Sequence, residues 1–169
     1  LENFPPQIWN QNAIGLLTDK VRAVRIAAAD LYHSIPISEI PATAKNAYAA
    51  ADSENKAFLV NQTDFAVGNV MLADYELQNE NYREAIRFYL RGLTKDSLMN
   101  YARLNLSATY NTVGENQKAL KTLQEAALID PANDRIFFNL GLLYYEMNNI
   151  TSAITNFQNI GGHLFVSGA

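Results

Sequence analysis

Few side chains in this sequence are of the types that carry catalysis or bind metals. The absence of cysteine excludes disulfides, thiolate metal sites and cysteine nucleophiles within these 169 residues. Of the two histidines, His33 stands beside a predicted helix end and His163 in an irregular tail, so neither has a partner at ligand spacing and both are interpreted as surface residues. Asp19 and Asp130 are better explained as cap or turn residues. Gly161-Gly162 lacks the strand, spacing and lysine of a phosphate-binding loop. We therefore expect no catalytic residue, no metal and no cofactor in this segment.

Composition indicates a globular protein that has no membrane span and gives little support for nucleic-acid binding. Hydrophobic residues make up 49% and charged residues 18% of the chain, which is typical of a folded domain. The net charge of −4 and the lack of a basic stripe argue against binding to nucleic acid. The longest apolar runs, such as 26–29 and 57–60, are far too short to span a membrane.

The strongest pattern in the sequence is a period of 34 residues between positions 66 and 160. Residues of matching size recur at this spacing in five columns: Ala85, Ala119 and Ala153; Tyr89, Leu123 and Phe157; Leu72, Leu106 and Leu140; Ala73, Ser107 and Gly141; Ile86, Leu120 and Ile154. This period predicts stacked helix–turn–helix units, in which small residues let helices approach closely and large ones fill the gap to the next unit. We predict an all-α superhelix, or solenoid.

Three repeats follow from this period, at 66–99, 100–133 and 134–167. Their first helices are predicted at 66–78, 100–112 and 134–146, and their second helices at 82–95, 116–129 and 150–160. Short polar turns, such as 79–81, connect the two helices of each repeat.

The residues that fill these columns resemble the tetratricopeptide repeat family. In the third repeat, Leu140-Gly141, Tyr144, Ala153 and Phe157 match the Leu-Gly, Tyr, Ala and aromatic positions of that family. The second repeat matches through Leu106-Ser107, Tyr110, Gly114, Ala119, Ala126 and Pro131. The first repeat departs from the pattern, with Glu76, Gly92 and Ser97 at the usual Tyr, Ala and Pro positions.

The N-terminal region, 1–35, is predicted to form a helical hairpin. Helices are expected at 7–17 and 20–32, with Thr18 and Asp19 as N-cap residues of the second. The packing face of this second helix is predicted from its apolar spacing as Val21, Val24, Ala28 and Leu31. Residues 16–31, with the turn aspartate, the Val-Arg pair and the alanine run, resemble a HEAT repeat.

Residues 36–65 are predicted to join the hairpin to the repeats. Pro36 and Pro41 indicate a bend, and the alanine-rich stretch 42–60 a helix. The polar residues 52–55 are either the exposed face of this helix or a break in it.

The third repeat lacks a recognisable capping helix. An uncapped apolar side around Leu143, Ile154 and Phe157 predicts a partner, self-association through this repeat, or a tail at 161–169 that folds back with Phe165 and Val166. The alternative is that the segment simply ends there.

In the tetratricopeptide family the first helix of each repeat lines a concave groove that binds protein segments. The resemblance places at such groove positions Val67, Val70, Met71, Asp74, Leu77, Gln78, Tyr101, Leu104, Asn105, Ala108, Asn111, Thr112, Arg135, Phe138, Asn139, Leu142, Tyr145 and Glu146. We expect Tyr101, Arg135, Phe138 and Tyr145 to be the main anchors. The alternative is that helix 42–60 buries several of these positions.

Some family members clamp a C-terminal carboxylate with lysine, arginine and asparagine in the groove. Asn105 and Arg135 match two of the five positions of that clamp, whereas Val70, Asp74 and Asn139 stand where lysine, asparagine and arginine are required. Asp74 would repel a carboxylate. We therefore expect no chaperone-tail clamp.

The order of a HEAT-like pair, a joining helix and tetratricopeptide repeats resembles the C-terminal part of bacterial multihaem c-type cytochrome family proteins. This resemblance implies an exported, periplasmic parent protein whose haem is attached upstream, because the segment has no Cys-x-x-Cys-His motif. We predict a non-catalytic scaffold that binds a protein or peptide. The alternative is an accessory domain that packs in cis against an upstream haem domain, and a stand-alone enzyme is a distant third.

Overall fold

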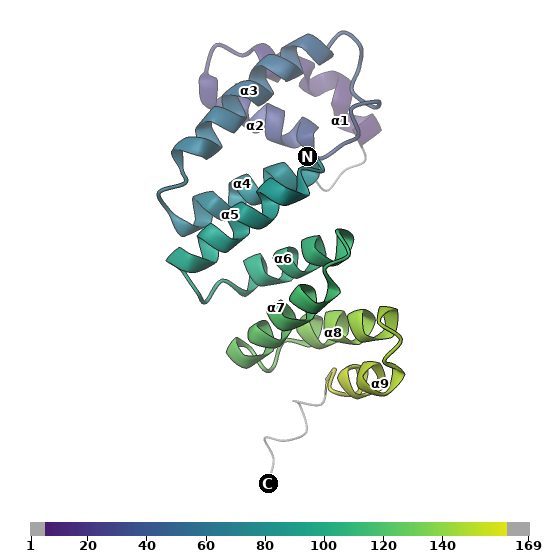
Figure 1. The fold of residues 1–169 in the computed structure, drawn as a ribbon. Helices are drawn as coiled ribbons and strands as arrows, with labels where there is room; N and C mark the ends of the chain where they lie inside the picture. The colour runs from purple at the N-terminus through teal and green to yellow at the C-terminus, as the bar shows by residue number, and fades with distance from the viewer. Residues whose placement is uncertain (1–5, 162–169) are drawn as a thin grey trace. The chain divides into compact units, whose positions relative to one another are not determined.

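The computed structural model describes residues 6–161, and within that range every regular element is a helix. Contacts divide the chain between residues 64 and 65 into an N-terminal unit and a repeat unit. The N-terminal unit contains α1 (Pro6–Ala13), the 3₁₀ helix η1 (Ile14–Thr18), α2 (Arg22–His33) and α3 (Lys45–Asn61). The repeat unit contains α4 (Ala66–Gln78), α5 (Tyr82–Lys95), α6 (Asn100–Thr112), α7 (Asn116–Ile129), α8 (Asp134–Glu146) and α9 (Ile150–Gln158) (Figure 1). The predicted all-α fold is confirmed.

The core of the N-terminal unit is centred on two aromatic residues. Trp9 of α1 meets Tyr32 of α2 edge to face, with ring centroids 5.3 Å apart, and the Tyr32 hydroxyl donates to the backbone carbonyl of Asn10. Both rings are buried, together with Leu17 of η1 and Ala29 of α2. Aromatic pairs in this geometry stabilise a core beyond the area that they bury.

Three details of the sequence prediction for this unit were wrong. The predicted helix 7–17 is split, because Gly15, a poor helix former, lies in a 3₁₀ turn that directs Leu17 into the core. The next helix begins at Arg22 with Val21 as its N-cap residue, while Asp19 Oδ1 accepts from the Val21 amide at 2.7 Å within the preceding turn. Val21 is therefore exposed, whereas Ala28 is buried and Leu31 packs against the core as predicted. Ala29 and Tyr32 complete the buried face of α2.

The helix α3 is continuous through residues 52–55, so these polar residues do not break it. Glu54 accepts hydrogen bonds from Arg25 Nε at 3.0 Å and Nη2 at 2.8 Å, which ties α3 to α2. Asn55 is buried. The polar stretch is thus partly an interhelical contact rather than a wholly exposed face. The helix begins at Lys45, three residues after the predicted start at Ala42, because Pro41 and the turn that follows it precede the helix.

His33 is not the surface residue that the sequence predicted. Its side chain is 4% exposed, with Nδ1 at 3.1 Å from the Tyr48 hydroxyl and at 3.6 Å from Asp52 Oδ1. Burial, followed by the negative charge of Asp52, raises the pKa of Tyr48 from 10.0 to about 12.

This pKa shift predicts that alkaline pH destabilises the protein. A tyrosine whose folded pKa exceeds its unfolded pKa contributes stability below pH 10, and this contribution is lost as the pH rises towards about 12. We expect the free energy of unfolding to fall across that interval, and to fall less steeply in Tyr48→Phe. Urea denaturation followed by circular dichroism at several pH values measures the slope. An identical slope in Tyr48→Phe would show that this hydroxyl does not contribute.

The repeat unit consists of three helical hairpins, α4–α5, α6–α7 and α8–α9 (Figure 1). Each helix packs chiefly against the helices that precede and follow it in sequence. The predicted bounds of the first five of these helices are confirmed. Helix α9 ends at Gln158 instead of Ile160, because the last amides bond three residues back and Gly161 adopts a left-handed φ of 73°.

Most of the predicted columns form the core of the repeat unit. The alanine column at positions 85, 119 and 153 and the leucine column at positions 72, 106 and 140 are buried throughout. The aliphatic column is less buried than predicted, since Ile154 is 51% exposed. At the end of the stack Ile150 and Ile160 are also exposed, but Leu143 is buried and is not part of an uncapped side. The predicted tail contacts of Phe165 and Val166 lie outside the described residues.

The three hairpin turns share a backbone conformation as well as a sequence period. Positive φ angles occur at Glu80 (59°), Gly114 (80°) and Asn148 (59°), which are 34 residues apart. Glycine and asparagine tolerate this left-handed conformation, whereas glutamate adopts it at a cost. The repeat period therefore extends to the geometry of the turns.

Candidate protein-binding groove

The predicted groove positions lie on α4, α6 and α8, and the structure leaves most of them at the surface. Tyr101, Phe138, Leu142 and Tyr145 are between 41% and 64% exposed. Ala108 and Arg135 are exposed, and Asp74, Asn105, Asn111 and Asn139 are half-buried. Val67 and Met71 of α4 are exposed as well. A row of apolar and polar side chains thus follows the first helix of each hairpin.

Two of the predicted groove residues lie in the core instead. Val70 is 3% and Leu104 is 6% exposed, so neither presents a side chain to a ligand. The residue at the same register in α8 is Phe138, which is 48% exposed and packs against Phe157 with ring centroids 6.1 Å apart. Of this column, only Phe138 is available for binding.

Asp74 accepts hydrogen bonds that link three helices at the α4–α6 end of the groove. Tyr89 of α5 and Asn105 of α6 donate to its Oδ1, at 2.5 Å and 3.0 Å, and Tyr101 of α6 donates to its Oδ2 at 3.1 Å. These bonds fix the ring of the predicted anchor Tyr101. Burial, followed by the charge of Asp74, raises the pKa of Tyr101, and burial with the Asp74 hydrogen bond raises that of Tyr89. Asp74 is therefore a structural acceptor as well as a negative charge at the surface.

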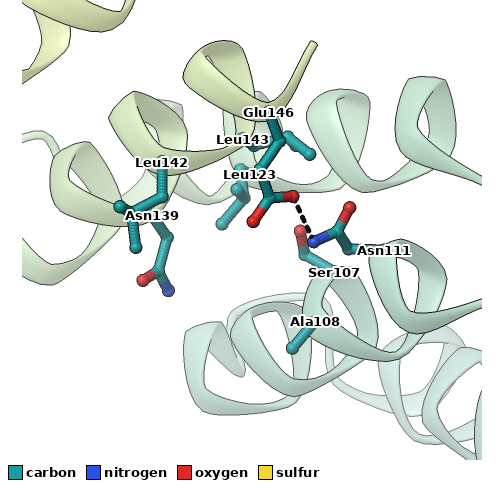
Figure 2. A pocket seen from close by; sticks show the side chains of 8 residues that line it. All are labelled: Ser107, Ala108, Asn111, Leu123, Asn139, Leu142, Leu143 and Glu146. Atoms are coloured by element: carbon teal, nitrogen blue, oxygen red, sulfur yellow. Dashed lines mark hydrogen bonds between the residues drawn. The ribbon is translucent and has the colours of Figure 1, made fainter. Parts of the chain in front are cut away.

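A pocket of about 140 Å³ lies between α6 and α8, with one residue of α7 in its lining. Figure 2 shows its lining, which includes the predicted groove residues Ala108, Asn111, Asn139, Leu142 and Glu146. Asn111 Nδ2 donates to Glu146 Oε2 at 2.7 Å across the pocket. The size and the mixed lining suit a single side chain of a bound segment better than a whole small molecule.

Sequence reasoning missed three pocket residues, Ser107, Leu123 and Leu143. Ser107 Oγ donates to the carbonyl of Ala119 at 2.9 Å, which ties α6 to α7 at this point. Two of the three belong to the periodic columns that were assigned to packing. Ser107 occupies a small-residue position, and a small side chain fills less space beside its helix. This residue type could have indicated the pocket from the sequence.

Nothing among residues 6–161 assembles into a metal site. No group of three or more His, Cys, Asp or Glu side chains is placed to hold an ion within that range. His163 lies outside it. Among the same residues, no helix is both long enough and apolar enough to cross a lipid bilayer.

The comparisons with known proteins agree with this geometry. Residues 109–148 match the TPR repeat family. The match covers the end of α6, all of α7 and all of α8. No curated protein sequence matches the chain.

Solved structures with a similar fold cover most of the chain. A crystal structure of MamA is 17% identical over 90% of this chain and 84% of its own, with a TM-score of 0.62. A second crystal structure of MamA protein is 19% identical over 91% and 88%, with a TM-score of 0.62. The second TPR of Spaghetti (RPAP3), bound to the HSP90 peptide SRMEEVD, is 19% identical over 59% and 93%, with a TM-score of 0.54. These likenesses show the fold. They do not bear on the HEAT-like pair, the cytochrome-type parent or export, which stay predictions.

Proposed function

We propose that the repeat unit is a non-catalytic scaffold whose groove, formed by α4, α6 and α8, binds an extended segment of another protein. The observation that carries this proposal is the row of exposed apolar side chains on the first helices, next to a pocket of side-chain size. Exposed aromatic residues with nearby carboxamides and charges are typical of binding surfaces. The TPR match and the peptide-bound neighbour support the same class of function.

The charges of the groove favour a neutral or basic segment. Asp74 and Glu146 bring negative charge to it, and Arg135 brings positive charge at α8. Arg135 is a single cation, and Val70 is buried and Asp74 is bonded to Tyr101 where a carboxylate clamp needs lysine and asparagine, so the groove lacks the full set of groups that a terminal carboxylate requires. We therefore propose that an apolar side chain enters the pocket, and that a carboxylate is not the recognised group.

Selection from a random peptide library supplies ligands with which the groove can be tested. We expect selected peptides to lose about tenfold or more in affinity for Tyr145→Ala and Phe138→Ala, because both aromatic rings are largely exposed and a bound segment would cover them. Leu128→Ala is the matched control, since Leu128 is 85% exposed on α7, outside the groove. Isothermal titration calorimetry measures the three affinities.

Amidation of the peptide C-terminus tests the charge preference separately. Equal or tighter binding of the amidated form is expected. Peptides that respond to Leu128→Ala but to neither groove substitution would contradict the proposed site.

A further inference from the structure

A second cavity lies outside the groove, between α5, α6 and α7. Its volume is about 460 Å³, within the range of small-molecule sites. Leu90 and Leu93 of α5 and Leu106 of α6 form apolar walls, and Arg103 of α6 and Lys121 of α7 bring positive charge. Because residues 103 and 105 differ by about 200° around a helix, Arg103 lies on the side of α6 opposite the groove residue Asn105.

Arg103 is a buried cation without a partner among the described residues. It is 8% exposed, and its Nε and Nη1 atoms are shielded from solvent without a hydrogen bond. Arginine is rarely buried unless it is paired, and buried donors that lack an acceptor in a folded protein require an explanation such as a bound ion.

The repeat period shows that this position does not require a charge for packing. Asn69 and Phe137 occupy the same register in α4 and α8. Only the middle hairpin places a guanidinium there, and it does so where a cavity adjoins the side chain. The charge is thus better explained by a ligand than by the stacking of the hairpins.

Glu125 of α7 also lines this cavity, and it is the acidic residue of the lining that could pair with Arg103. No hydrogen bond joins the two side chains in the described structure. Lys118 is paired with Glu115, and this contact raises the pKa of Lys118. Lys121 also lines the cavity, but within the described residues Arg103 is the lining cation that is buried, and it has no counter-charge there.

We propose that this cavity binds a small organic monocarboxylate, with the carboxylate on Arg103 and an aliphatic body against the three leucines. A guanidinium pairs with a carboxylate through two parallel hydrogen bonds, and the apolar walls select an anion that carries a hydrocarbon chain. An inorganic anion would satisfy the arginine but leave the leucine walls uncovered.

Nuclear magnetic resonance of the isotope-labelled full chain tests this proposal with sodium hexanoate as the probe. We expect saturable shifts at the Arg103 Nε–H signal and at the amides of Leu90 and Leu106. Hexanol, which has the same body without the charge, should bind weakly, and so should inorganic phosphate, which has charge without the body. Arg103→Met should weaken hexanoate binding roughly ten- to hundredfold.

The controls separate the proposal from simpler explanations. Arg103→Lys keeps the charge and should retain part of the binding, which covers the case in which Arg103→Met folds poorly. Glu125→Gln should leave hexanoate binding unchanged or tighter. The proposal would be overturned by equal shifts with phosphate or by shifts that do not saturate with hexanoate. It would also be overturned if Glu125→Gln shifted the Arg103 Nε–H signal in the absence of hexanoate, because Glu125 would then be the partner of Arg103.

Discussion

Replacing Tyr89 with alanine is expected to lower the free energy of unfolding of the repeat unit by about 3–5 kcal/mol. The ring is fully buried between helices, and its hydroxyl donates to Asp74. The substitution therefore leaves a cavity and removes a charge-assisted hydrogen bond at once. Urea denaturation of the full chain, followed by circular dichroism, measures the loss.

Tyr89→Phe separates the two contributions. It keeps the ring and removes only the hydroxyl, while Asp74 retains its hydrogen bonds to Tyr101 and Asn105. Hydrogen bonds to charged groups contribute roughly 1.5–3 kcal/mol, and we expect the free energy of unfolding to fall by an amount at the lower end of this range. If both variants lost the same stability, packing of the ring would not be the main contribution.

The second large effect is expected at Gly141, where α8 meets α9. A Cβ atom added there would lie 2.4 Å from Cε1 and 2.6 Å from Cδ1 of Phe157. Alanine normally favours a helix by about 1 kcal/mol over glycine, but here the ring or the helix must move. We expect Gly141→Ala to destabilise the protein by about 1–3 kcal/mol.

A double-mutant cycle with Phe157→Ala tests whether this loss arises from the ring. Without the ring the added methyl group has space, so the double variant should lose less stability than the sum of the two single variants. The same denaturation experiment gives all three values. Strict additivity of the two losses would show that the Phe157 ring does not restrict Gly141.

The helix bounds of the repeat unit were predictable from sequence because the three hairpins can be compared at equivalent positions. A boundary that is ambiguous in one copy, such as the end of the helix at Lys95, is fixed by its counterpart at Ile129. The N-terminal unit offers no second copy. The 3₁₀ turn around Gly15 and the N-cap at Val21 depend on the packing of Leu17 and Tyr32 in one core. That packing is a tertiary contact, which the local sequence pattern does not predict.

The candidate groove was only partly predictable, for a similar reason. Val70 is covered by α5 at Gly92. The two residues pack so closely that a Cβ atom added at Gly92 would lie 3.0 Å from Cγ2 of Val70. The equivalent of Gly92 in the third hairpin is Ile160, which lies beyond the end of α9 and is 37% exposed. Phe138 is therefore not covered as Val70 is. Groove positions that are transferred from one hairpin to the next assume helices of equal length, so they do not predict the exposure that follows from the shorter α9.

Sequence reasoning could not predict the hydrogen bonds of Asp74, nor that the Arg103 guanidinium has no partner among residues 6–161. Asp74 joins residues that are 15, 27 and 31 positions away, and no period relates these distances. Arg103 stands in a column with Asn69 and Phe137, which share neither size nor charge. A column without a common residue type gives no packing prediction. The irregularity nevertheless indicates that the residue at position 103 is not set by the packing of the repeats.

The packing of each helix on its neighbours in sequence also determines how the repeat unit reaches its native state. Few distant segments must meet before a hairpin is stabilised, so the entropy lost in closing long loops is small. Chains with such local topology cross the folding barrier quickly. The short α9, which contacts α8 at one end of the series, is then the natural place for native-state opening to begin, while the interior hairpin opens last.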